Sequence, residues 1–444
     1  MTNDPEVPHE PVDENTPLLS RQQLDDSDFQ AALTKTQHLE RDDFPEGGLK
    51  AWSVVFGSWC AMVAAFGLLT SSGVMHAWLS AHQLKDHTYG QTGWIFSTFT
   101  FLVYFGSIQI GPIFDAYGLK FTLVPGCVGL VTAVFLLSIS QEYWHYMLSW
   151  GVLGGLSASL IFTPATVCIG HWFKQRLALA TSLALTAGGI GGALYPFIIL
   201  TLQSQIGFNV SIQIVGLICL LLCLLASTLV TTRLPPNTRA GATIDLLTLR
   251  EPLYLLTTAA IFLLELALFI PVTYIPSYAT AHGLAPEQAY ALVIYLNLGS
   301  VVGRAVTGYV ADHVGRFRTM IFTSGVTALL TPLWAFADGD TRLITAYAVA
   351  FGAASGSFIA VTPVCVAQIC LAEDYGKRYG TTYFVVSFGT LVGVPLAGAI
   401  LDLGGKAPNF EGLIWFSGGV FALGGLGFVA AMGVATKWNF RTRF

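Results

Sequence analysis

Long apolar runs, separated by short polar segments, fill almost the whole chain after residue 50. A helix that crosses a bilayer needs about 20 largely apolar residues. Twelve runs reach this length: 52–80, 91–112, 119–140, 143–168, 176–201, 210–232, 254–280, 287–311, 318–336, 342–367, 379–402 and 412–436. The pattern therefore predicts an all-α integral membrane protein with twelve transmembrane helices.

The composition agrees with this pattern. Of the 444 residues, 54% are hydrophobic and 11% are charged, and the mean hydropathy is +0.63. A soluble domain usually carries about 25% charged residues, so a soluble protein is excluded. The first 50 residues are polar, and for this reason we expect no cleavable signal peptide.

Those first 50 residues form a separate acidic segment. They hold 12 of the 26 acidic residues and only four basic ones, a net charge of −8. A segment with many charges and few aromatic residues does not bury enough apolar surface to fold. We predict a disordered cytoplasmic tail over 1–50. Within it, ENTPLL fits an acidic dileucine signal that would engage sorting machinery through Glu14, Leu18 and Leu19, although so short a pattern also arises by chance.

A polar connector divides six spans from six. The predicted domains after the tail are a six-helix bundle at 51–233, a cytoplasmic linker at 234–251, a second six-helix bundle at 252–437 and a short cytoplasmic tail at 438–444. With the N-terminus inside, 17 of the 21 lysines and arginines fall on the inner side and three on the outer side. Because basic residues favour cytoplasmic loops, we expect both termini in the cytoplasm.

The two halves repeat one another. GPIFDAYGLKFT follows the second span and GYVADHVGRFRT follows the eighth, so that Asp115 and Asp312 are 197 positions apart. Pro196 and Pro395 match at an offset of 199. Such landmarks predict a duplicated six-helix unit, with the copies related about an axis along the membrane normal.

The repeated loop has a plausible gating chemistry. Its aspartate is expected just past a helix end, near the next helix N-terminus, where an anion is favoured. Its glycine permits a tight turn, and its bases are expected to pair with an acid of the opposite half and hold the inner side closed. Ordinary loop charges are the alternative. The predicted gating residues are Asp115, Gly118, Lys120, Asp312, Gly315, Arg316 and Arg318.

These paired loops resemble the signature of the major facilitator superfamily. PEGGLKAW before the first span and HWFKQRLALATSLALTAGGIGG in the fifth resemble motifs of the monocarboxylate transporter family, and NLGSVVGRAVTGYVAD is similar to its fungal branch. The resemblance covers 44 to about 436. It implies two six-helix domains around a central cavity with alternating access. Fungal members carry carboxylates, riboflavin or secondary metabolites, so the resemblance leaves the substrate open.

Two positions depart from the animal proton-coupled members. These proteins carry a lysine deep in the first span, where Thr70 stands here, and an aspartate one turn before the arginine of the eighth span, where Ser300 stands. Arg304 matches the arginine itself. The resemblance therefore implies that the anion-binding charge is kept, and it puts proton coupling in question.

Arg304 stands in an apolar run, where a charge costs a few kcal/mol unless it faces water or an acid. The acid available within a span is Glu265, in the seventh. Counted from the same side at 1.5 Å per residue, Glu265 lies about 16 Å deep and Arg304 about 10 Å deep. We therefore expect a direct or water-bridged pair. The alternative is that Glu265 contacts another helix, the backbone or a lipid headgroup.

Four more polar or aromatic residues are predicted to line the cavity together with Thr70, Arg304 and Glu265. They lie on the seventh, eighth and eleventh spans, where packing against helices or lipid is the alternative role: Tyr274, Tyr278, Asn297 and Phe384.

The leading function is a secondary transporter of a small organic anion or related metabolite. The alternatives are an efflux carrier for a fungal metabolite, a riboflavin-like vitamin carrier and, less favoured, a non-transporting sensor. An enzyme is disfavoured, because the sequence has no nucleotide loop, metal cluster or Ser/His/Asp set in context. We expect no cofactor, no metal and no nucleic acid as a partner. The expected location is the plasma membrane, with vacuole or endosome as alternatives.

Overall fold

The computed structural model describes residues 44–87, 89–233, 245–337, 340–403 and 408–439. The dileucine pattern, nearly all of the predicted acidic tail, most of the linker and the last residues lie outside these ranges. Residues 1–44 form a separate unit from 45–444, and the description that follows concerns the second unit.

The predicted twelve-helix membrane protein is confirmed. Twelve helical segments of the described chain are long and apolar enough to cross a bilayer, and these described residues form helices and loops without strands. The first six spans are built from α2 (Gly48–Ala81), α3 (Tyr89–Phe105) with α4 (Ser107–Tyr117), α5 (Lys120–Ile139), α6 (Tyr143–Tyr146) with α7 (Gly155–Val167), α8 (Leu177–Ile206) and α9 (Phe208–Leu229). The last six are built from α10 (Pro252–Ala281), α11 (Pro286–Val314), α12 (Arg316–Leu330), α13 (Thr341–Gln368), α14 (Tyr375–Asp402) and α15 (Phe410–Ala435).

Several boundaries differ from the sequence prediction. Helix α2 begins at Gly48, inside the segment assigned to the tail. The second span is divided at Gly106 into α3 and α4 and continues to Tyr117, five residues past its predicted end. The fourth span contains a π-helical stretch, Met147–Gly154, between α6 and α7. The eighth span likewise continues past its predicted end, to Val314. Asp115 and Asp312, the two aspartates that lie 197 positions apart, are therefore in helices rather than in loops.

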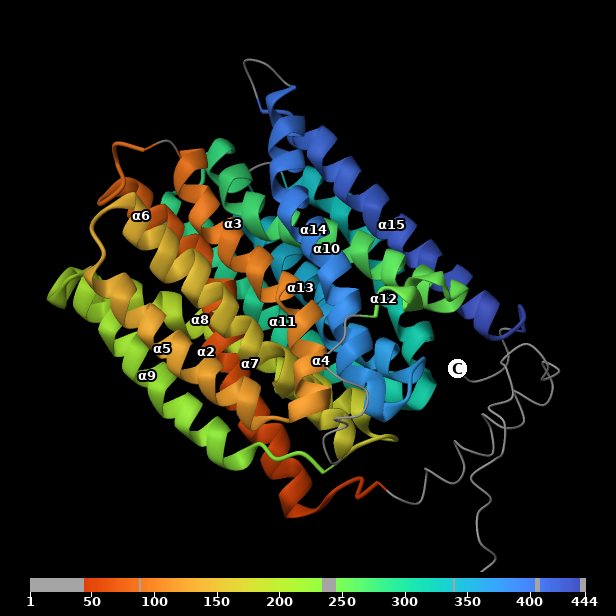
Figure 1. Ribbon diagram of the computed structural model, residues 1–444. Helices are drawn as coiled ribbons and strands as arrows, with labels where there is room; N and C mark the ends of the chain where they lie inside the picture. Colours follow the sequence, from red (N-terminus) through yellow and green to blue (C-terminus); the bar gives the residue numbers. More distant parts are fainter. Residues whose placement is uncertain (1–43, 88, 234–244, 338–339, 404–407, 440–444) are drawn as a thin grey trace, which may run out of the picture. The chain divides into compact units, whose positions relative to one another are not determined.

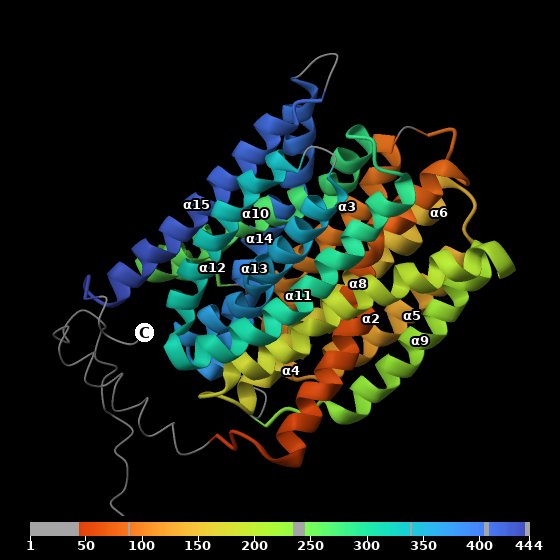
Figure 2. The same ribbon diagram turned by 180° about the vertical axis from the view of Figure 1, so that it is seen from behind.

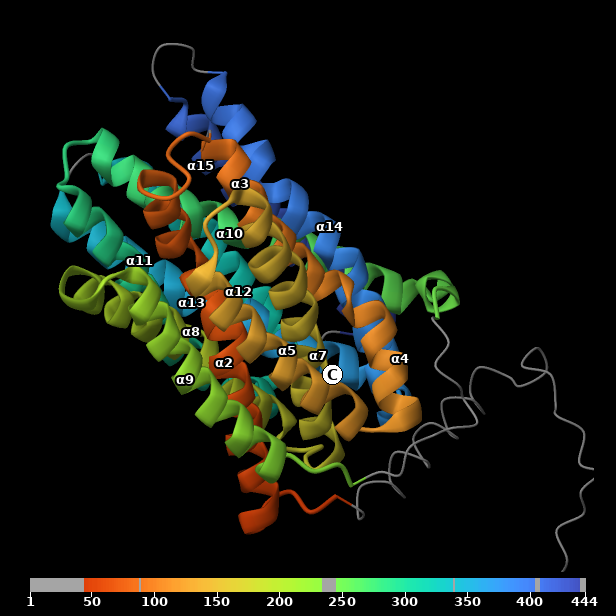
Figure 3. The same ribbon diagram turned by 60° about the vertical axis from the view of Figure 1, so that its left-hand side comes forward.

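The first six spans lie on one side of the bundle and the last six on the other (Figures 1 and 2). Helices α8 and α14 make the main contacts between them, and α8 also packs against α13 and α14 against α7. Helix α8 packs against α11, and α14 packs against α3 and α4, a contact visible at the near edge of the bundle in Figure 3.

Glycines allow the close approach at these two junctions. A Cβ atom on Gly111 of α4 would overlap the carbonyl oxygen of Gly376 in α14. On the other junction, a Cβ on Gly189 of α8 would lie 2.8 Å from the carbonyl oxygen of Asn297 in α11. Small residues let helix backbones approach within a membrane, so both junctions rest on backbone packing.

The outer surface of the bundle suits lipid. Helix α9, for example, exposes a leucine stripe that includes Leu217, Leu221 and Leu224. Such large apolar side chains are stable at a surface only when hydrocarbon or another protein covers them. The chain is therefore a multi-pass membrane protein.

Candidate transport site and gate

Two aspartates tie the halves together at one end of the bundle. Asp115 in α4 accepts a hydrogen bond of 2.7 Å from the backbone N–H of Lys377, in the first turn of α14. Asp312 in α11 accepts bonds of 3.0 and 2.8 Å from the backbone N–H groups of Ala178 and Leu179, in the first turn of α8. Each carboxylate therefore caps a helix that belongs to the opposite half.

This arrangement corrects one part of the sequence prediction. The aspartates lie in the last turn of α4 and α11, not past the helix ends, and neither caps the next helix in sequence. The first N–H groups of a helix have no partner within the helix, and its positive dipole end favours an anion. Gly118 and Gly315 then end the two helices with φ of 84° and 117°, a conformation that glycine adopts without strain.

Among the basic residues of the two loops, Arg316 reaches the opposite half, but through a backbone carbonyl and not an acid. Arg316 donates to the backbone carbonyl of Lys174, 2.7 Å away in the other half, and its guanidinium lies 4.0 Å from Asp312 of its own half. Lys120 is exposed at the start of α5, and Arg318 is half-buried in α12. We expected Arg316 to pair with an acid of the opposite half. It binds a backbone carbonyl instead, because the backbone of the segment before α8 lies next to its guanidinium.

Glu46, from the first half, also binds the segment 174–176 that precedes α8. Its carboxylate accepts hydrogen bonds from the backbone N–H groups of Lys174 and Gln175, each at 2.6 Å, and of Arg176 at 3.1 Å. Glu46 belongs to PEGGLKAW, the motif before the first span, but no role was assigned to it from sequence. The start of α8 is thus held by Glu46 from its own half and by Asp312 from the other. We call this end of the bundle, with Asp115, Asp312 and the first turns of α8 and α14, the capped end.

Arg304 lies at the centre of the bundle with 2% of its surface exposed. Its Nη1 donates to the backbone carbonyl of Leu185 in α8, and the guanidinium lies 5.7 Å from the ring centre of Phe66 in α2. Its Nε donates to no group of the described chain. Arg304 therefore reaches across from the last six spans to the first six and keeps an unused donor.

Glu265 in α10 is 1% exposed, and neither of its carboxyl oxygens has a hydrogen-bond partner among the described residues. The direct ion pair with Arg304 that depth along the helices suggested is not formed, although the two charges interact electrostatically. The reason is the direction of the arginine side chain, which points at Leu185 and Phe66 of the other half. The alternative prediction, that Glu265 would bind backbone or a lipid headgroup, is also not met. Its carboxyl group is buried and has no hydrogen-bond partner among the described residues.

Three buried tyrosines that the sequence analysis missed pack together on α3 and α14. Tyr383 stacks on Tyr104 at 5.3 Å and lies 4.5 Å from Tyr379, measured between ring centres. All three tyrosines interact electrostatically with Glu265. We call Arg304, Glu265, Tyr104, Tyr379 and Tyr383 the central cluster. Its members come from α3, α10, α11 and α14. No sequence motif marks the tyrosines: Tyr104 and Tyr383 stand near apolar stretches, and Tyr379 follows Lys377 and Arg378 at the start of α14.

Thr70 and Asn297 lie together beside the junction of α2, α8 and α11. Thr70 donates to the carbonyl of Gly188 at 2.7 Å. A Cβ on Gly192 would lie 3.0 Å from Oδ1 of Asn297 and 2.5 Å from Oγ1 of Thr70. Ser300 donates to the carbonyl of Asn297, one helical turn before Arg304. The predicted set Thr70, Asn297 and Arg304 therefore lies along one helical junction.

The other predicted cavity residues are placed elsewhere. Tyr274 donates to the carbonyl of Val394 at 3.0 Å, so it links α10 to α14. Tyr278 stacks against His282 and contacts Trp334 and Phe410 within the last six spans. Phe384 packs at 5.1 Å from Phe105, across the contact between α14 and α3.

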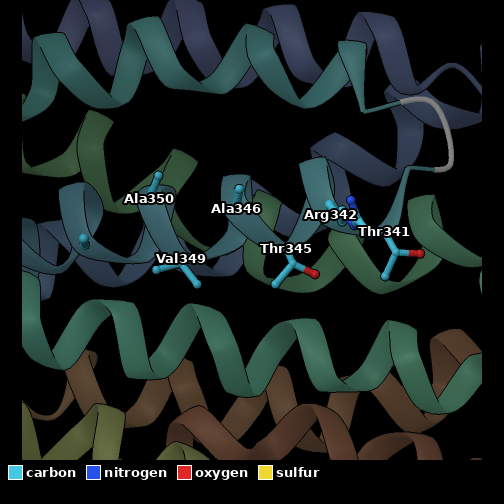
Figure 4. Close-up of a pocket in the computed structure, with 7 residues that line it drawn as sticks. Thr341, Arg342, Thr345, Ala346, Val349 and Ala350 are labelled. Atoms are coloured by element: carbon cyan, nitrogen blue, oxygen red, sulfur yellow. The ribbon is translucent and has the colours of Figure 1, made fainter.

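A groove runs along one face of α13 (Figure 4). It contains no member of the central cluster and none of the residues predicted from sequence. Its lining residues are Thr341, Arg342, Thr345, Ala346, Val349, Ala350 and Ala353.

The protein combines twelve apolar helices with reciprocal caps at one end of the bundle and a buried charged cluster at its centre. These are the features of a membrane transporter. The chain belongs to the Major Facilitator Superfamily, whose family description matches residues 51–351 and 287–439. It is 33% identical over 404 residues to the riboflavin transporter MCH5 of Saccharomyces cerevisiae, covering 85% of this chain and 77% of that protein. It is 30% identical over 391 residues to the aspyridones efflux protein apdF of Emericella nidulans, covering 87% and 79%.

Solved structures share the fold at low sequence identity. The human organic anion transporter MFSD10 superposes with a TM-score of 0.68 at 14% identity, covering 85% of this chain and 98% of that one. The fucose transporter FucP in its outward conformation gives 0.66 at 16% identity, covering 86% and 99%. The relatives and the fold are those of transporters, and this chain is a transporter of the superfamily.

Proposed function

We propose that this transporter moves a small organic anion, or a related metabolite with an acidic group, by alternating access, and that Arg304 binds the acidic group. The observation that carries the proposal is the unused Nε donor of a guanidinium that is 2% exposed and lies between the two halves. A planar guanidinium binds a carboxylate with two parallel hydrogen bonds. Burying an arginine at membrane depth costs a few kcal/mol, so a charge in this position usually has a functional role.

The aromatic rings around Arg304 support a second candidate, a conjugated metabolite or a riboflavin-like vitamin. Phe162 in α7 contacts both Phe66 in α2 and Tyr104 in α3, and flat rings stack favourably on such side chains. The similarity to a riboflavin transporter and to an aspyridones efflux protein supports the same candidate. The motifs quoted from the sequence support membership of the fungal monocarboxylate transporter branch as part of this proposal.

The capped end acts, in this proposal, as the cytoplasmic gate. The six-helix units 51–233 and 252–437 rock against one another, and opening breaks the caps made by Asp115 and Asp312. The excess of lysine and arginine on this side supports a cytoplasmic location for both termini. The plasma membrane is the proposed location, and ENTPLL, through Glu14, Leu18 and Leu19, would redirect the protein to vacuole or endosome.

The test is uptake and efflux by the purified full-length protein in liposomes, with pyruvate, lactate, an aromatic carboxylate and riboflavin as probes. Arg304→Lys keeps a positive charge but loses the two-pronged donor geometry. We expect the initial rate for the transported probe to fall at least tenfold at matched protein abundance. Arg342→Lys is the matched control, because Arg342 is an exposed arginine at the start of α13.

A rate near that of the unaltered protein for Arg304→Lys would mean that the arginine serves packing, and the binding role would be wrong. Transport of riboflavin without transport of the carboxylates would favour the second candidate. Transport of none of the probes by the unaltered protein would exclude both substrate proposals as stated.

A further inference from the structure

Three tyrosines stand at four-residue spacing in the first half of α14: Tyr375, Tyr379 and Tyr383. Residues four apart lie one above the other on the same face of an α-helix, and all three tyrosines are buried. The hydroxyl group of Tyr375 donates to the carbonyl of Pro363 at 2.9 Å. The hydroxyl groups of Tyr379 and Tyr383 have no hydrogen-bond partner among the described residues. One face of α14 therefore carries two neighbouring unsatisfied phenols.

Such phenols are unfavourable in a protein interior. A buried hydroxyl group without a partner has lost its hydrogen bonds to water and gained none in return. Other buried tyrosines avoid this loss, since Tyr195 donates to the carbonyl of Val63 at 3.1 Å and Tyr254 to that of Arg378 at 2.7 Å. Most buried polar groups are hydrogen-bonded, so two unsatisfied donors side by side indicate that a ligand supplies the partner.

The two phenols lie at the contact between the halves. Tyr383 stacks on Tyr104 of α3 at 5.3 Å, and Phe162 of α7 contacts Tyr383 at 5.9 Å and Tyr379 at 6.4 Å, measured between ring centres. These rings belong to opposite halves, so they separate when the halves rock apart as the proposed gate requires. Their flat faces and the two hydroxyl groups then become accessible to a molecule in the transport path.

Ring contacts connect the phenols to Arg304. The guanidinium lies 5.7 Å from the ring centre of Phe66, and Phe66 lies 5.4 Å from Phe162, which contacts both tyrosines. One end of this series offers a charged donor, the other end offers two neutral donors, and apolar ring faces lie between them. Binding sites commonly combine apolar walls with a few placed polar groups that fix the orientation of the ligand.

We propose that Tyr379 and Tyr383 are specificity-determining residues of the substrate site, and that the substrate is a flat, conjugated acid with an uncharged acceptor oxygen away from its acidic group. This inference rests on the proposed function, in which Arg304 binds the acidic group. The phenols donate to the acceptor oxygen, and the rings of Tyr104 and Phe162 pack against the flat part of the substrate. A small aliphatic acid leaves both phenols unsatisfied and is therefore a poor substrate.

The test compares two ligands of nearly the same shape, para-acetylbenzoate and para-isopropylbenzoate, of which only the first has a carbonyl oxygen opposite its carboxylate. Calorimetry measures their binding to the purified full-length protein in lipid nanodiscs. We expect the unaltered protein to bind para-acetylbenzoate roughly tenfold more tightly, because a site built to donate hydrogen bonds rejects an analogue without the acceptor. The double variant Tyr379→Phe with Tyr383→Phe keeps both rings and should bind the two ligands about equally.

Tyr347→Phe is the matched control. The phenol of Tyr347 is also buried without a partner in the described part of the chain, but it stacks on Trp334 within the last six spans. This variant should keep the preference for para-acetylbenzoate. If the double variant folds poorly, Tyr383→Phe alone should still lower the preference, because it removes one of the two donors.

Equal affinity for the two ligands in the unaltered protein, or binding of neither, would overturn the inference, because the phenols would then select no acceptor oxygen. An unchanged preference in the double variant, or its loss in Tyr347→Phe as well, would also overturn it. The transport rate of Arg304→Lys is a separate result. A rate near that of the unaltered protein removes the acid-binding role even if the phenols select the ligand, and a low rate supports that role even if they do not.

Discussion

The carboxylate of Asp115 accepts a hydrogen bond from the backbone N–H of Lys377, 262 positions further along the chain. Asp312 makes the reciprocal contact with Ala178 and Leu179, and the two caps are related by the internal repeat. A side-chain cap at a helix N-terminus contributes about 0.5–2 kcal/mol. For the proposed gate, caps of this size would favour the closed capped end and would still be weak enough to break in each transport cycle.

Asp312→Asn should slow transport several-fold while leaving folding largely intact. The amide keeps one acceptor for the N–H groups of Ala178 and Leu179 but loses the negative charge that favours the helix dipole. A loss of about 1 kcal/mol shifts the equilibrium between closed and open capped end about five-fold. The measurement is the initial transport rate at matched abundance, together with the melting temperature.

The matched control for this variant is Asp340→Asn. Asp340 also caps a helix, α13, through the N–H groups of Arg342 and Leu343, but it lies in the same half as that helix. It should leave the transport rate unchanged. If Asp312→Asn and Asp340→Asn have the same rate, the cap between the halves has no part in gating.

Gly111→Ala should hold the capped end open. A methyl group at this position overlaps the carbonyl oxygen of Gly376 on α14, so the two halves cannot approach fully. Single cysteines are introduced at positions of the central cluster, and a thiol reagent is added on the capped side. We expect these cysteines to be labelled faster in the Gly111→Ala protein than in the protein with Gly111. Gly419→Ala is the control, since no atom lies within 4 Å of a Cβ built at that glycine. Equal labelling in the two variants would contradict the proposed gate.

Glu46→Gln should lower the melting temperature and the transport rate together. The carboxylate satisfies three backbone N–H groups before α8, and Arg316 and Asp312 bind the same region from the other half. Hydrogen bonds to a charged group contribute about 1.5–3 kcal/mol each when measured by removal. Glu411→Gln, at an exposed position in α15, should have no effect on either quantity. An unchanged melting temperature in Glu46→Gln would show that the hydrogen bonds of Glu46 do not stabilise the protein.

The orientation is tested by accessibility in intact cells. A tag at either terminus should be reached only after the membrane is permeabilised, because both ends are expected in the cytoplasm. A tag beside Lys85, in the loop between α2 and α3, should be labelled from outside. Labelling of a terminus in an intact cell would reverse the assignment, including the cytoplasmic position of the capped end.

Much of the fold was predictable because it depends on local properties of the chain. A bilayer has a fixed thickness, so the length of each apolar run determines a span without any knowledge of its neighbours. The repeat of Asp115 and Asp312 was equally visible, since it is a matter of spacing. Arg304 could be singled out as a charge in an apolar run for the same reason.

Only the tertiary structure decided what these residues contact. Asp115 meets Lys377 and Asp312 meets Ala178 because two helix junctions bring distant segments together, and no local pattern encodes which helix end lies opposite. Depth along a helix suggested that Arg304 and Glu265 would pair, but depth does not fix the rotation of a helix or the direction of a side chain. Packing turns Arg304 toward Leu185 and leaves the carboxyl group of Glu265 without a partner.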